Sequence, residues 1–434
     1  YILIWLIRWL KACHGFFHKK WVHAVIIILY VLAAFSMLAG LIDLPTGLHR
    51  LAKHVENYWL GFLLYIIFVV AIADLIKVIV KTIYRKKGLD QTRLRSRRTF
   101  VVSGAVCMIV IAVIGVYGMV NAGIIRTTDY DITVDKSGGN MDSMKVVLVA
   151  DLHMGYSIGT DHIANMVKKI NTQDPDVVVI AGDIFDNDYD ALEDPEKLEK
   201  TFRKIKSRYG VYACYGNHDI KEKILAGFTF KSKEKKESDP RMDAFLEAAG
   251  IKLLQDDSVL IDDSVYIYGR ADSRHPGRGI SKRKTPEQIM DSLDRSKPVI
   301  VIAHEPDELG ELSDAGVDVD LCGHTHDGQM FPGNLTTALV WENSYGYLNK
   351  NGMHNIVTSG VGIFGPDMRV GTIAEVCPIT IKFNKQQEEE ERKQQEKEAA
   401  AAAAREYENK KNPAAAEKDE KKPLSGDASR PYSK

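Results

Sequence analysis

The chain has 434 residues, of which 45% are hydrophobic and 26% are charged, and its formal net charge is −1. This length exceeds one average domain, and the near-zero charge averages an apolar, basic first third, a mixed middle and a charged, alanine-rich end. The five cysteines include no C-x-x-C pair, so their spacing excludes a zinc ribbon and does not indicate a disulfide framework.

Three apolar segments in the first third predict transmembrane helices. Residues 21–42 and 99–125 contain no Asp, Glu, Lys or Arg, and residues 57–80 form a third candidate that is weakened by Asp74. About 20 apolar residues are enough to cross the hydrocarbon core as a helix. Buried helices of a soluble domain are the alternative, but so many apolar segments leave too little polar sequence to cover them. We expect a membrane domain over residues 1–125, with three complete spans and a truncated first span at Tyr1.

The basic residues of this region predict its orientation. They precede the first complete span and separate the second complete span from the last, at Arg8, Lys11, Lys19 and Lys20, and then at Lys77, Lys81, Arg85, Lys86, Lys87, Arg93, Arg95, Arg97 and Arg98. Lys and Arg favour cytoplasmic loops, so we expect every residue after 125 to lie outside the cytoplasm of a multi-pass protein of the cell membrane. A patch for lipid phosphate or nucleic acid is the alternative, but orientation alone accounts for these charges and no specific nucleic-acid partner is indicated.

The pattern changes after residue 125. Residues 126–143 are polar and predict a linker, and short apolar runs then predict strands buried on both faces at 145–150, 176–181, 211–215, 298–303 and 317–322. Helix-like segments lie between some of these strands, at 161–173 and 195–207. The pattern is typical of an α/β domain over residues 144–384. Residues 385–434 form a charged low-complexity tail, for which a spacer is the default interpretation.

Polar residues follow each of five predicted strands. The motifs are D-L-H at 151–153, G-D at 182–183, G-N-H-D at 216–219, H-E-P at 304–306 and G-H-T-H at 323–326. An isolated H-x-H is more often a pair of solvated histidines than a site. The carboxyl ends of strands in an α/β sheet gather ligand-binding loops, however, so we expect the five motifs to converge in one crevice.

The converging set contains two carboxylates, one amide and four imidazoles, namely Asp151, His153, Asp183, Asn217, His304, His324 and His326. Mixed carboxylate and imidazole ligands suit Mn, Fe or Zn better than Ca or Mg. Seven ligands are too many for one tetrahedral site, and they suit two divalent transition-metal ions that share one carboxylate. Such a pair activates a bridging water as hydroxide and holds phosphoryl oxygens, so the set predicts phosphoester hydrolysis.

The ordered series D-x-H, GD, GNHD, H and GHTH resembles the calcineurin-like metallophosphoesterase superfamily. The resemblance implies a two-sheet β-sandwich flanked by helices. The stretches "GHTHDGQMFPGN", "YGYLNKNGMH" and "VTSGVGIFGPDMRVGT" look like the YkuE/YaeI-type branch, which includes multi-pass membrane members with an extracytoplasmic enzyme domain.

The resemblance also implies a role for each motif residue. Asp151, His153 and His326 would bind one ion, Asn217, His304 and His324 would bind the other, and Asp183 would bridge them. His218 would stabilise developing charge as an imidazolium and protonate the leaving oxygen. Asp186 matches the carboxylate that orients this histidine in the family, and Asp219 is a second choice. Asn187 stands where the serine/threonine phosphatases have arginine, so a resemblance to protein phosphatases is not supported.

Four arginines in loops with Gly and Pro are candidates for holding substrate phosphate, namely Arg270, Arg274, Arg278 and Arg369. Ordinary surface arginines are more common, and Arg369 is the preferred candidate because its loop belongs to the branch pattern. The expected function is a membrane-anchored, extracytoplasmic, metal-dependent phosphoesterase acting on phosphomono- or diesters of lipids, wall polymers or nucleotides. The alternatives are a non-catalytic metal-binding transmembrane receptor and a cytoplasm-facing lipid-diphosphate hydrolase. A proton donor such as His218 beside the metal ligands favours catalysis.

Overall fold

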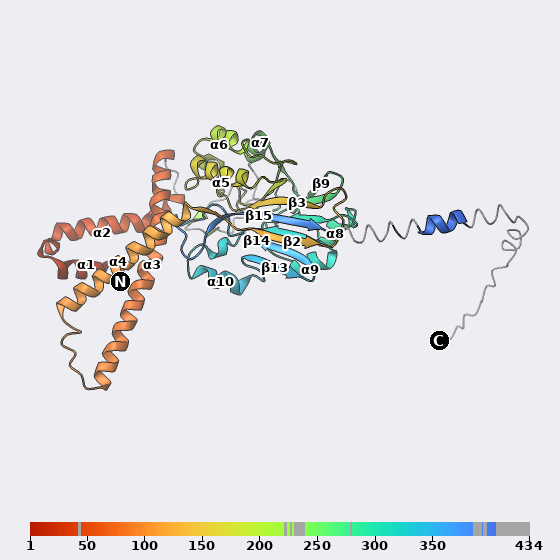
Figure 1. The fold of residues 1–434 in the computed structure, drawn as a ribbon. Coiled ribbons are helices and arrows are strands. Elements are labelled where there is room, and N and C mark those ends of the chain that lie inside the picture. The colour runs from red at the N-terminus through yellow and green to blue at the C-terminus, as the bar shows by residue number, and fades with distance from the viewer. Residues whose placement is uncertain are drawn as a thin grey trace, which may run out of the picture.

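The computed structural model describes residues 1–41, 45–220, 224–225, 228–229, 239–277, 280–384, 393 and 397–404. Long helices at the N-terminus lead into a body built from sheets and shorter helices (Figure 1). Most of the predicted tail, and Arg278, lie outside the described residues.

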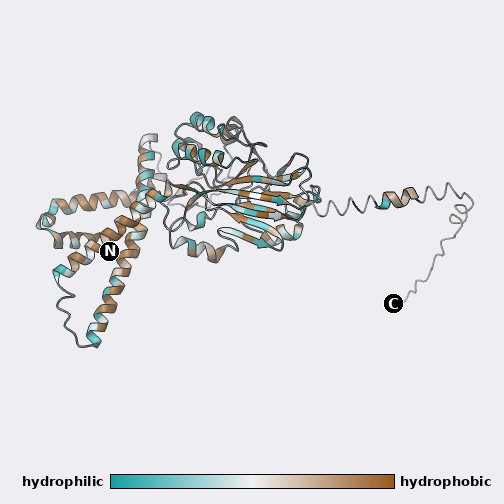
Figure 2. Ribbon diagram, in the orientation of Figure 1, coloured by the Kyte–Doolittle hydropathy of each residue, from teal (hydrophilic) through white to brown (hydrophobic). Residues whose placement is uncertain are grey.

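Three helices are long and apolar enough to cross a membrane, as predicted. They are α2 (Lys20–Phe35), α3 (Thr46–Lys86) and α4 (Arg97–Ala122), and α2 continues as an apolar segment to Leu38. Figure 2 shows that apolar residues cover much of their length. The first helix, α1 (Ile2–Cys13), has 12 residues and is therefore only about 18 Å long. Asp74, the one acidic residue of the second predicted span, accepts a hydrogen bond from the Tyr1 hydroxyl.

The first sheet of the body has seven strands. Its order is β1 (Ile125–Thr127), β15 (Ala374–Phe383), β3 (Ser143–Val149), β4 (Val177–Ala181), β5 (Val211–Cys214) and β8 (Ile251–Leu253), and β2 (Tyr130–Val134) also pairs with β15. Strands β3, β4, β5 and β8 are parallel, so their carboxyl ends lie at one edge. Their side chains are mostly Val, Ile and Ala, which suit a strand buried on both faces.

The second sheet has six strands, in the order β13 (Gly346–Lys350), β14 (Met353–Val357), β12 (Val319–Cys322), β11 (Val299–Ile302), β10 (Val265–Gly269) and β9 (Asp257–Ile261). The two sheets face each other across a core in which Val146 and Val179 of the first sheet pack with Ile300 and Leu321 of the second. A separate two-stranded sheet pairs β6 (Ile224–Leu225) with β7 (Phe228–Thr229).

Helices cover the outer face of each sheet. On the first sheet lie α5 (Thr160–Thr172), α6 (Pro195–Phe202) and α7 (Pro240–Ala249), and on the second lie α8 (Pro286–Asp291) and α9 (Leu309–Ala315) (Figure 1). A further short helix, α10 (Gly333–Val340), follows the G-H-T-H motif at 323–326. The predicted two-sheet sandwich flanked by helices is confirmed.

The segment 126–143 is not a free linker in the structure. Strand β1 begins at Ile125, three residues after α4 ends, and both β1 and β2 pair in parallel with the long strand β15. Polar composition predicted a linker because β1 and β2 are short and only partly buried. The last span therefore passes almost directly into the first sheet.

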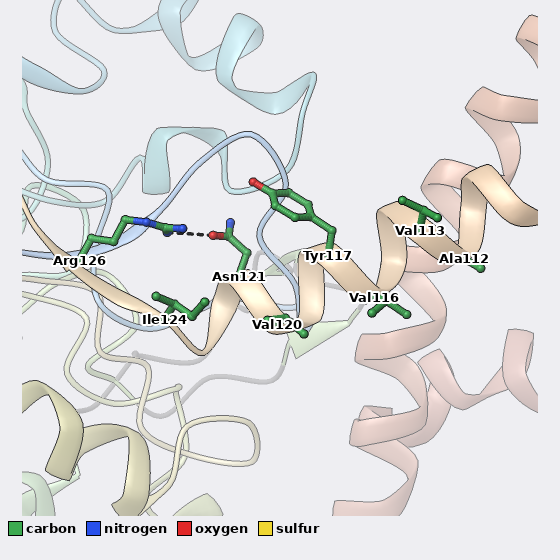
Figure 3. A pocket seen from close by; sticks show the side chains of 8 residues that line it. All are labelled: Ala112, Val113, Val116, Tyr117, Val120, Asn121, Ile124 and Arg126. Atoms are coloured by element: carbon green, nitrogen blue, oxygen red, sulfur yellow. Dashed lines mark hydrogen bonds between the residues drawn. The ribbon is translucent and has the colours of Figure 1, made fainter.

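The spans also pack against the body. Asn57 of α3 donates hydrogen bonds to Ser157 at 2.9 Å and to Asp367 at 3.3 Å, and Asn121 of α4 donates to the carbonyl oxygens of Arg369 at 3.0 Å and Thr372 at 2.8 Å. Figure 3 shows the end of α4, where Asn121 also accepts a hydrogen bond of 2.8 Å from Arg126. The same figure shows an apolar groove along α4, lined by Ala112, Val113, Val116, Tyr117, Val120 and Ile124 together with these two polar residues.

Candidate metal centre

The five predicted motifs meet at the ends of the central strands. Asp151 and His153 follow β3, Asp183 follows β4, and His304 and His324 follow β11 and β12 of the other sheet. Backbone hydrogen bonds tie these loops together, since Asp151 N–H donates to Gly182, His153 N–H to Asp183 and Gly323 N–H to His304. The ligand positions are thus held by the ends of two packed sheets.

One cluster brings together Asp151, His153 and His326, all buried, with ligand atoms that lie within 4.8 Å of one another. Nε2 of His153 is 3.0 Å from Nε2 of His326, and the latter is 3.8 Å from Oδ1 of Asp151. Two facing imidazole nitrogens cannot both present lone pairs at this distance unless a proton or a cation lies between them. The cluster could hold a metal ion.

A second cluster brings together Asp183, His304 and His324 under the same distance limit. Asn217 belongs with it, because its Oδ1 lies 3.0 Å from both Nε2 of His304 and Nδ1 of His324. This second cluster has the composition predicted for the second ion.

Asp183 lies between the two clusters. Its Oδ2 is 3.0 Å from Nε2 of His304 in the second cluster and 3.7 Å from Nε2 of His153 in the first. Its Oδ1 accepts a hydrogen bond of 2.8 Å from the backbone N–H of His218. One carboxylate therefore faces both clusters, which is the arrangement that a bridging ligand requires.

The protonation of two of the four imidazoles fits divalent cations directly, whereas nearby carboxylates raise the pKa values of His304 and His153, which would release a proton on binding a metal. Burial, together with the nearby His304, lowers the pKa of His324 to about 3, and burial with His153 lowers the pKa of His326 well below its usual value. Both rings are therefore neutral at pH 7 and retain a lone pair for a metal. Burial raises the pKa of Asp151 to about 6, and a cation in the first cluster would favour its ionised form.

The backbone of the ligand loops adopts an uncommon conformation. Asp151, His153, Asp183, His324 and His326 all have positive φ values, between 44° and 72°. A non-glycine residue in this left-handed region costs on the order of 1–3 kcal/mol and persists only where the surroundings enforce it. Such outliers concentrate at functional sites, and here they coincide with five of the seven predicted ligands.

Two motif glycines allow the ligand loops to approach each other closely. A Cβ on Gly216 would lie 2.3 Å from Oδ1 of Asp183, and a Cβ on Gly323 would lie 2.6 Å from Oδ2 of Asp151. Real Cβ atoms do not approach heavy atoms so closely. The glycine in G-N-H-D and the one in G-H-T-H are thus needed for the two carboxylates to occupy their places.

His218 lies beside the clusters, but its partner is not the predicted one. Its Nδ1 is 2.5 Å from Oδ1 of Asn187, whereas Asp186, the expected partner, lies 3.8 Å from Nδ1 of His153. Asp219 accepts backbone hydrogen bonds from Phe185 and Gly216 and so is engaged elsewhere. The sequence could not separate Asp186 from its neighbour, because the turn decides which of the two side chains faces the imidazole.

Arg369 is buried next to a predicted ligand, so the structure does not support its predicted contact with substrate phosphate. The guanidinium is fully buried and donates to the backbone oxygens of Ser359 at 2.7 Å, Gly362 at 2.8 Å and Ile373 at 2.6 Å. It also lies 3.4 Å from Nδ1 of His326. Arg369 therefore supports the loop behind a predicted ligand, and the branch pattern that made it the preferred candidate does not reveal its burial.

The other candidate arginines divide into two groups. Arg270 is buried and paired with Glu308 at 2.5 Å, which is a structural arrangement. Arg274 is exposed, and its Nε lies 3.9 Å from the carboxylate of Glu305, which in turn lies 3.6 Å from Nε2 of His324. Arg274 is thus an exposed arginine whose charge acts on a predicted ligand, because, in addition to burial, it helps to lower the pKa of His324.

Sequence reasoning missed two aromatic residues at the site. The ring of Phe364 lies 4.5 Å from that of His218 and 5.2 Å from that of His153, and the ring of Trp341 lies 5.3 Å from that of His324. Neither residue stands within a ligand motif. Only their position in otherwise glycine- and proline-containing loops could have signalled them.

Comparisons with known proteins agree with this geometry. A model of the calcineurin-like phosphoesterase family matches residues 144–328. A transmembrane protein with metallophosphoesterase domain from Danio rerio is 27% identical over 348 residues, which cover 75% of each chain. The corresponding protein from Bos taurus is 26% identical, and the match covers 68% of this chain and 65% of that one.

Two further similarities extend across bacteria. The UDP-2,3-diacylglucosamine pyrophosphatase LpxG of Chlamydia trachomatis is 23% identical over 48% of this chain and 70% of its own. The solved structure of a 5'-nucleotidase precursor from Thermus thermophilus has 14% identity and a TM-score of 0.32, over 55% of this chain and 54% of that one. The finer assignment to the YkuE/YaeI-type branch stays a prediction.

Proposed function

We propose that this chain, whose residues 144–328 match the calcineurin-like phosphoesterase family, is a membrane-anchored hydrolase that uses two divalent metal ions to cleave phosphomono- or diesters. The observation that carries the proposal is the position of Asp183, whose carboxylate faces both clusters of candidate ligands. A receptor that merely binds one ion needs no shared carboxylate. The proposal assigns seven ligands, namely Asp151, His153, Asp183, Asn217, His304, His324 and His326.

The chemistry follows from the residues of the site. When bound, two such ions polarise the phosphoryl oxygens and lower the pKa of a coordinated water. His218 lies beside His153 and Asp183 and, when protonated, would donate a proton to the leaving oxygen; burial lowers its pKa, which favours release of that proton. Asn187 accepts from Nδ1 of His218 and thereby directs Nε2 toward the substrate. Phe364 packs on the His218 ring and restricts its rotation.

The donor set supports Mn, Fe or Zn as the resident metals. Four imidazoles, two carboxylates and one amide oxygen form a mixed shell, whereas Ca and Mg prefer shells made of oxygen alone. Burial keeps His324 and His326 neutral, so neither ring must lose a proton at pH 7 before it binds a metal.

We place the catalytic domain outside the cytoplasm. The proposal rests on the Lys and Arg residues at the far ends of the spans, at Lys19, Lys20, Arg85, Lys86 and Arg97, which favour the cytoplasmic side. The body lies at the opposite ends of α2 and α4 (Figure 1).

Metal content and turnover of the full chain in detergent test this function. The parent should contain about two transition-metal ions per chain and hydrolyse an aryl phosphodiester after loading with Mn²⁺. Asp183→Asn should lower both quantities, whereas His354→Asn, on β14 and outside the clusters, should change neither. A fully loaded protein that hydrolyses neither mono- nor diesters would instead favour the metal-binding receptor. Complete protection of the body from protease added to intact cells would favour the cytoplasm-facing lipid-diphosphate hydrolase.

A further inference from the structure

The exposed apolar residues of the body are concentrated in one place. After Ile124, the described residues include five exposed large hydrophobic side chains, and four of them lie between residues 331 and 340, at Phe331, Leu335, Leu339 and Val340. Leu339 is 88% exposed and Val340 is 75% exposed. The fifth, Tyr347, lies on β13. So much apolar surface on one short helix marks an interaction site rather than ordinary scatter.

The sequence around this helix is free of charge. From Gly328 to Trp341 there is no Asp, Glu, Lys or Arg, although 26% of the whole chain is charged. Helix α10 lies within this uncharged segment and has no buried residue. The polar residues of α10 are Asn334, Thr336 and Thr337, which are uncharged. No charge therefore opposes entry of its apolar residues into the acyl boundary of a lipid leaflet.

The segment that leads into α10 contacts the spans. The hydroxyl of Tyr65, in α3, donates a hydrogen bond of 3.0 Å to the backbone oxygen of Phe331. Met330 and Met368 pack in one apolar cluster with Tyr65, and Phe62 of the same helix and Ile114 of α4 join it. The start of α10 is therefore continuous with the surface that joins the body to the membrane helices.

The position of Tyr65 along α3 sets the depth of this contact. Asn57 makes the polar contact with Ser157, and Tyr65 follows eight residues later. At 1.5 Å per residue the Phe331 contact lies roughly 12 Å further along α3, within its apolar part. Figure 1 shows α10 on the side of the body that faces the lower half of α3. Phe331 thus lies at the level of the span rather than above it.

The other end of α10 leads to the metal centre. Trp341 follows Val340 directly, and its ring lies 5.3 Å from the ring of His324, with the two planes at 79°. His324 is a predicted ligand of the second ion. The helix therefore connects a contact with the spans at one end to the candidate site at the other.

We propose that α10, together with Phe331, lies in the interface of the bilayer leaflet next to the body, and that it opens the metal centre toward phosphoesters carried by membrane lipids. The substrate part of this proposal rests on the phosphoesterase function proposed above. The occupant of the surface is the bilayer, because the surface continues from the spans and carries no charge. Leu335, Leu339 and Val340 enter the acyl boundary, and Trp341 lies where the lipid headgroup meets the site.

Depth measurement tests the surface without any need for activity. A fluorophore is attached to the new cysteine of Leu339→Cys, and the full chain is reconstituted in vesicles of phosphatidylcholine and phosphatidylglycerol. Tyr347→Cys is the matched control at another exposed apolar residue. The parent chain, treated with the same label, gives the background. Lipids with a nitroxide on the acyl chain should quench the label at 339 several-fold more than the label at 347. Equal quenching at both positions, with equal access to aqueous iodide, would overturn the proposal. If a second copy of the chain covers this surface instead of lipid, the fluorescence of the label at 339 should depend on the density of protein in the vesicles and not on the nitroxide lipid.

Turnover of two diesters with the same leaving group tests the substrate class. Hexadecyl p-nitrophenyl phosphate in vesicles should be cleaved with a kcat/KM about tenfold or more above that of soluble methyl p-nitrophenyl phosphate. The double substitution Leu339→Asp and Val340→Asp should lower this ratio of kcat/KM values to about one. The control pair Leu339→Met and Val340→Ile should preserve the ratio, and both double variants should have the same metal content. A parent ratio near one would refute the lipid substrate class. If neither diester is cleaved by the metal-loaded parent, the phosphoesterase function fails, and the quenching result still decides the docking surface.

Discussion

Nδ1 of His218 lies 2.5 Å from Oδ1 of Asn187, and no carboxylate occupies that position. The amide oxygen can only accept, so Nδ1 carries the proton and Nε2 faces away from Asn187. An amide orients the ring without adding a negative charge to it. In this chain the histidine is therefore positioned by a neutral partner, and burial lowers its pKa although the charges of Asp183 and Asp186 act in the opposite direction.

Substitution of Asn187 should separate positioning from charge. We expect Asn187→Ala to lower kcat for an aryl phosphodiester about tenfold to a hundredfold with little change in KM or metal content, because the ring is no longer oriented. Asn187→Asp should restore part of kcat. A carboxylate beside an imidazole raises its pKa, so the alkaline limb of the kcat profile should move to higher pH in this variant. Unchanged pH profiles in both variants would contradict the positioning role.

Asp183 and Asp186 should respond differently to the same change. Asp183→Asn removes the carboxylate that faces both clusters, so metal analysis should show a loss at both sites and turnover should fall by at least about a hundredfold. Asp186→Asn, three residues later, should retain the metals, because its carboxylate lies 3.8 Å from His153 and outside both clusters. Equal metal loss in the two variants would show that Asp183 does not bridge.

Removal of Arg369 should destabilise the body. Its buried guanidinium donates to three backbone oxygens within 2.8 Å. Arg369→Met would leave the oxygens of Ser359 and Gly362 without these donors, whereas Ile373 would still accept from the Ser359 hydroxyl. Ser359 and Gly362 lose their donors and a buried charge is removed, so a loss of about 3 kcal/mol in the free energy of unfolding is expected, measured by denaturant unfolding of the full chain in detergent. Arg274→Met, at an exposed arginine, provides the control and should cost under about 0.5 kcal/mol.

The stability of the body should also depend on the ionisation of Asp320. Burial raises the pKa of this carboxyl to about 6, and its Oδ1 has no hydrogen-bond partner. Its pKa in the unfolded chain is about 3.9. Between pH 4 and pH 6 the carboxyl therefore ionises in the unfolded state but not in the folded state, and the free energy of unfolding falls by on the order of 3 kcal/mol. Asp320→Asn should therefore grow more stable relative to the parent between pH 4 and pH 6, with a constant difference above pH 7. A difference that does not change with pH would contradict a raised pKa.

The central strands and most of the site were predictable because their signals are local. Each ligand motif directly follows an apolar run, and parallel strands bring their carboxyl ends to one edge whatever the details of packing. The runs at 176–181 and 317–322 became β4 and β12, and the two clusters formed where the motifs were expected. The three spans were predictable from apolar length alone.

The errors concern contacts between segments far apart in the chain. The linker prediction at 126–143 failed because β1 and β2 are short and partly exposed, and only pairing with β15 makes them strands. Arg369 is the preferred phosphate ligand from the branch pattern of its loop, yet α4 packs on that loop and the side chain is buried. Asn187 and Trp341 acquire their places from turns whose direction no local pattern specifies.

The short step from α4 into β1 has a consequence for the reach of the enzyme. Only Gly123 and Ile124 separate the last span from the first sheet, and Asn57 and Tyr65 hold the body to α3 as well. The catalytic domain therefore cannot swing on a tether, and the height of its reaction centre above the lipid is fixed by the anchor itself. Phosphoesters held far from the membrane, even abundant ones, would have to approach the membrane surface to be cleaved.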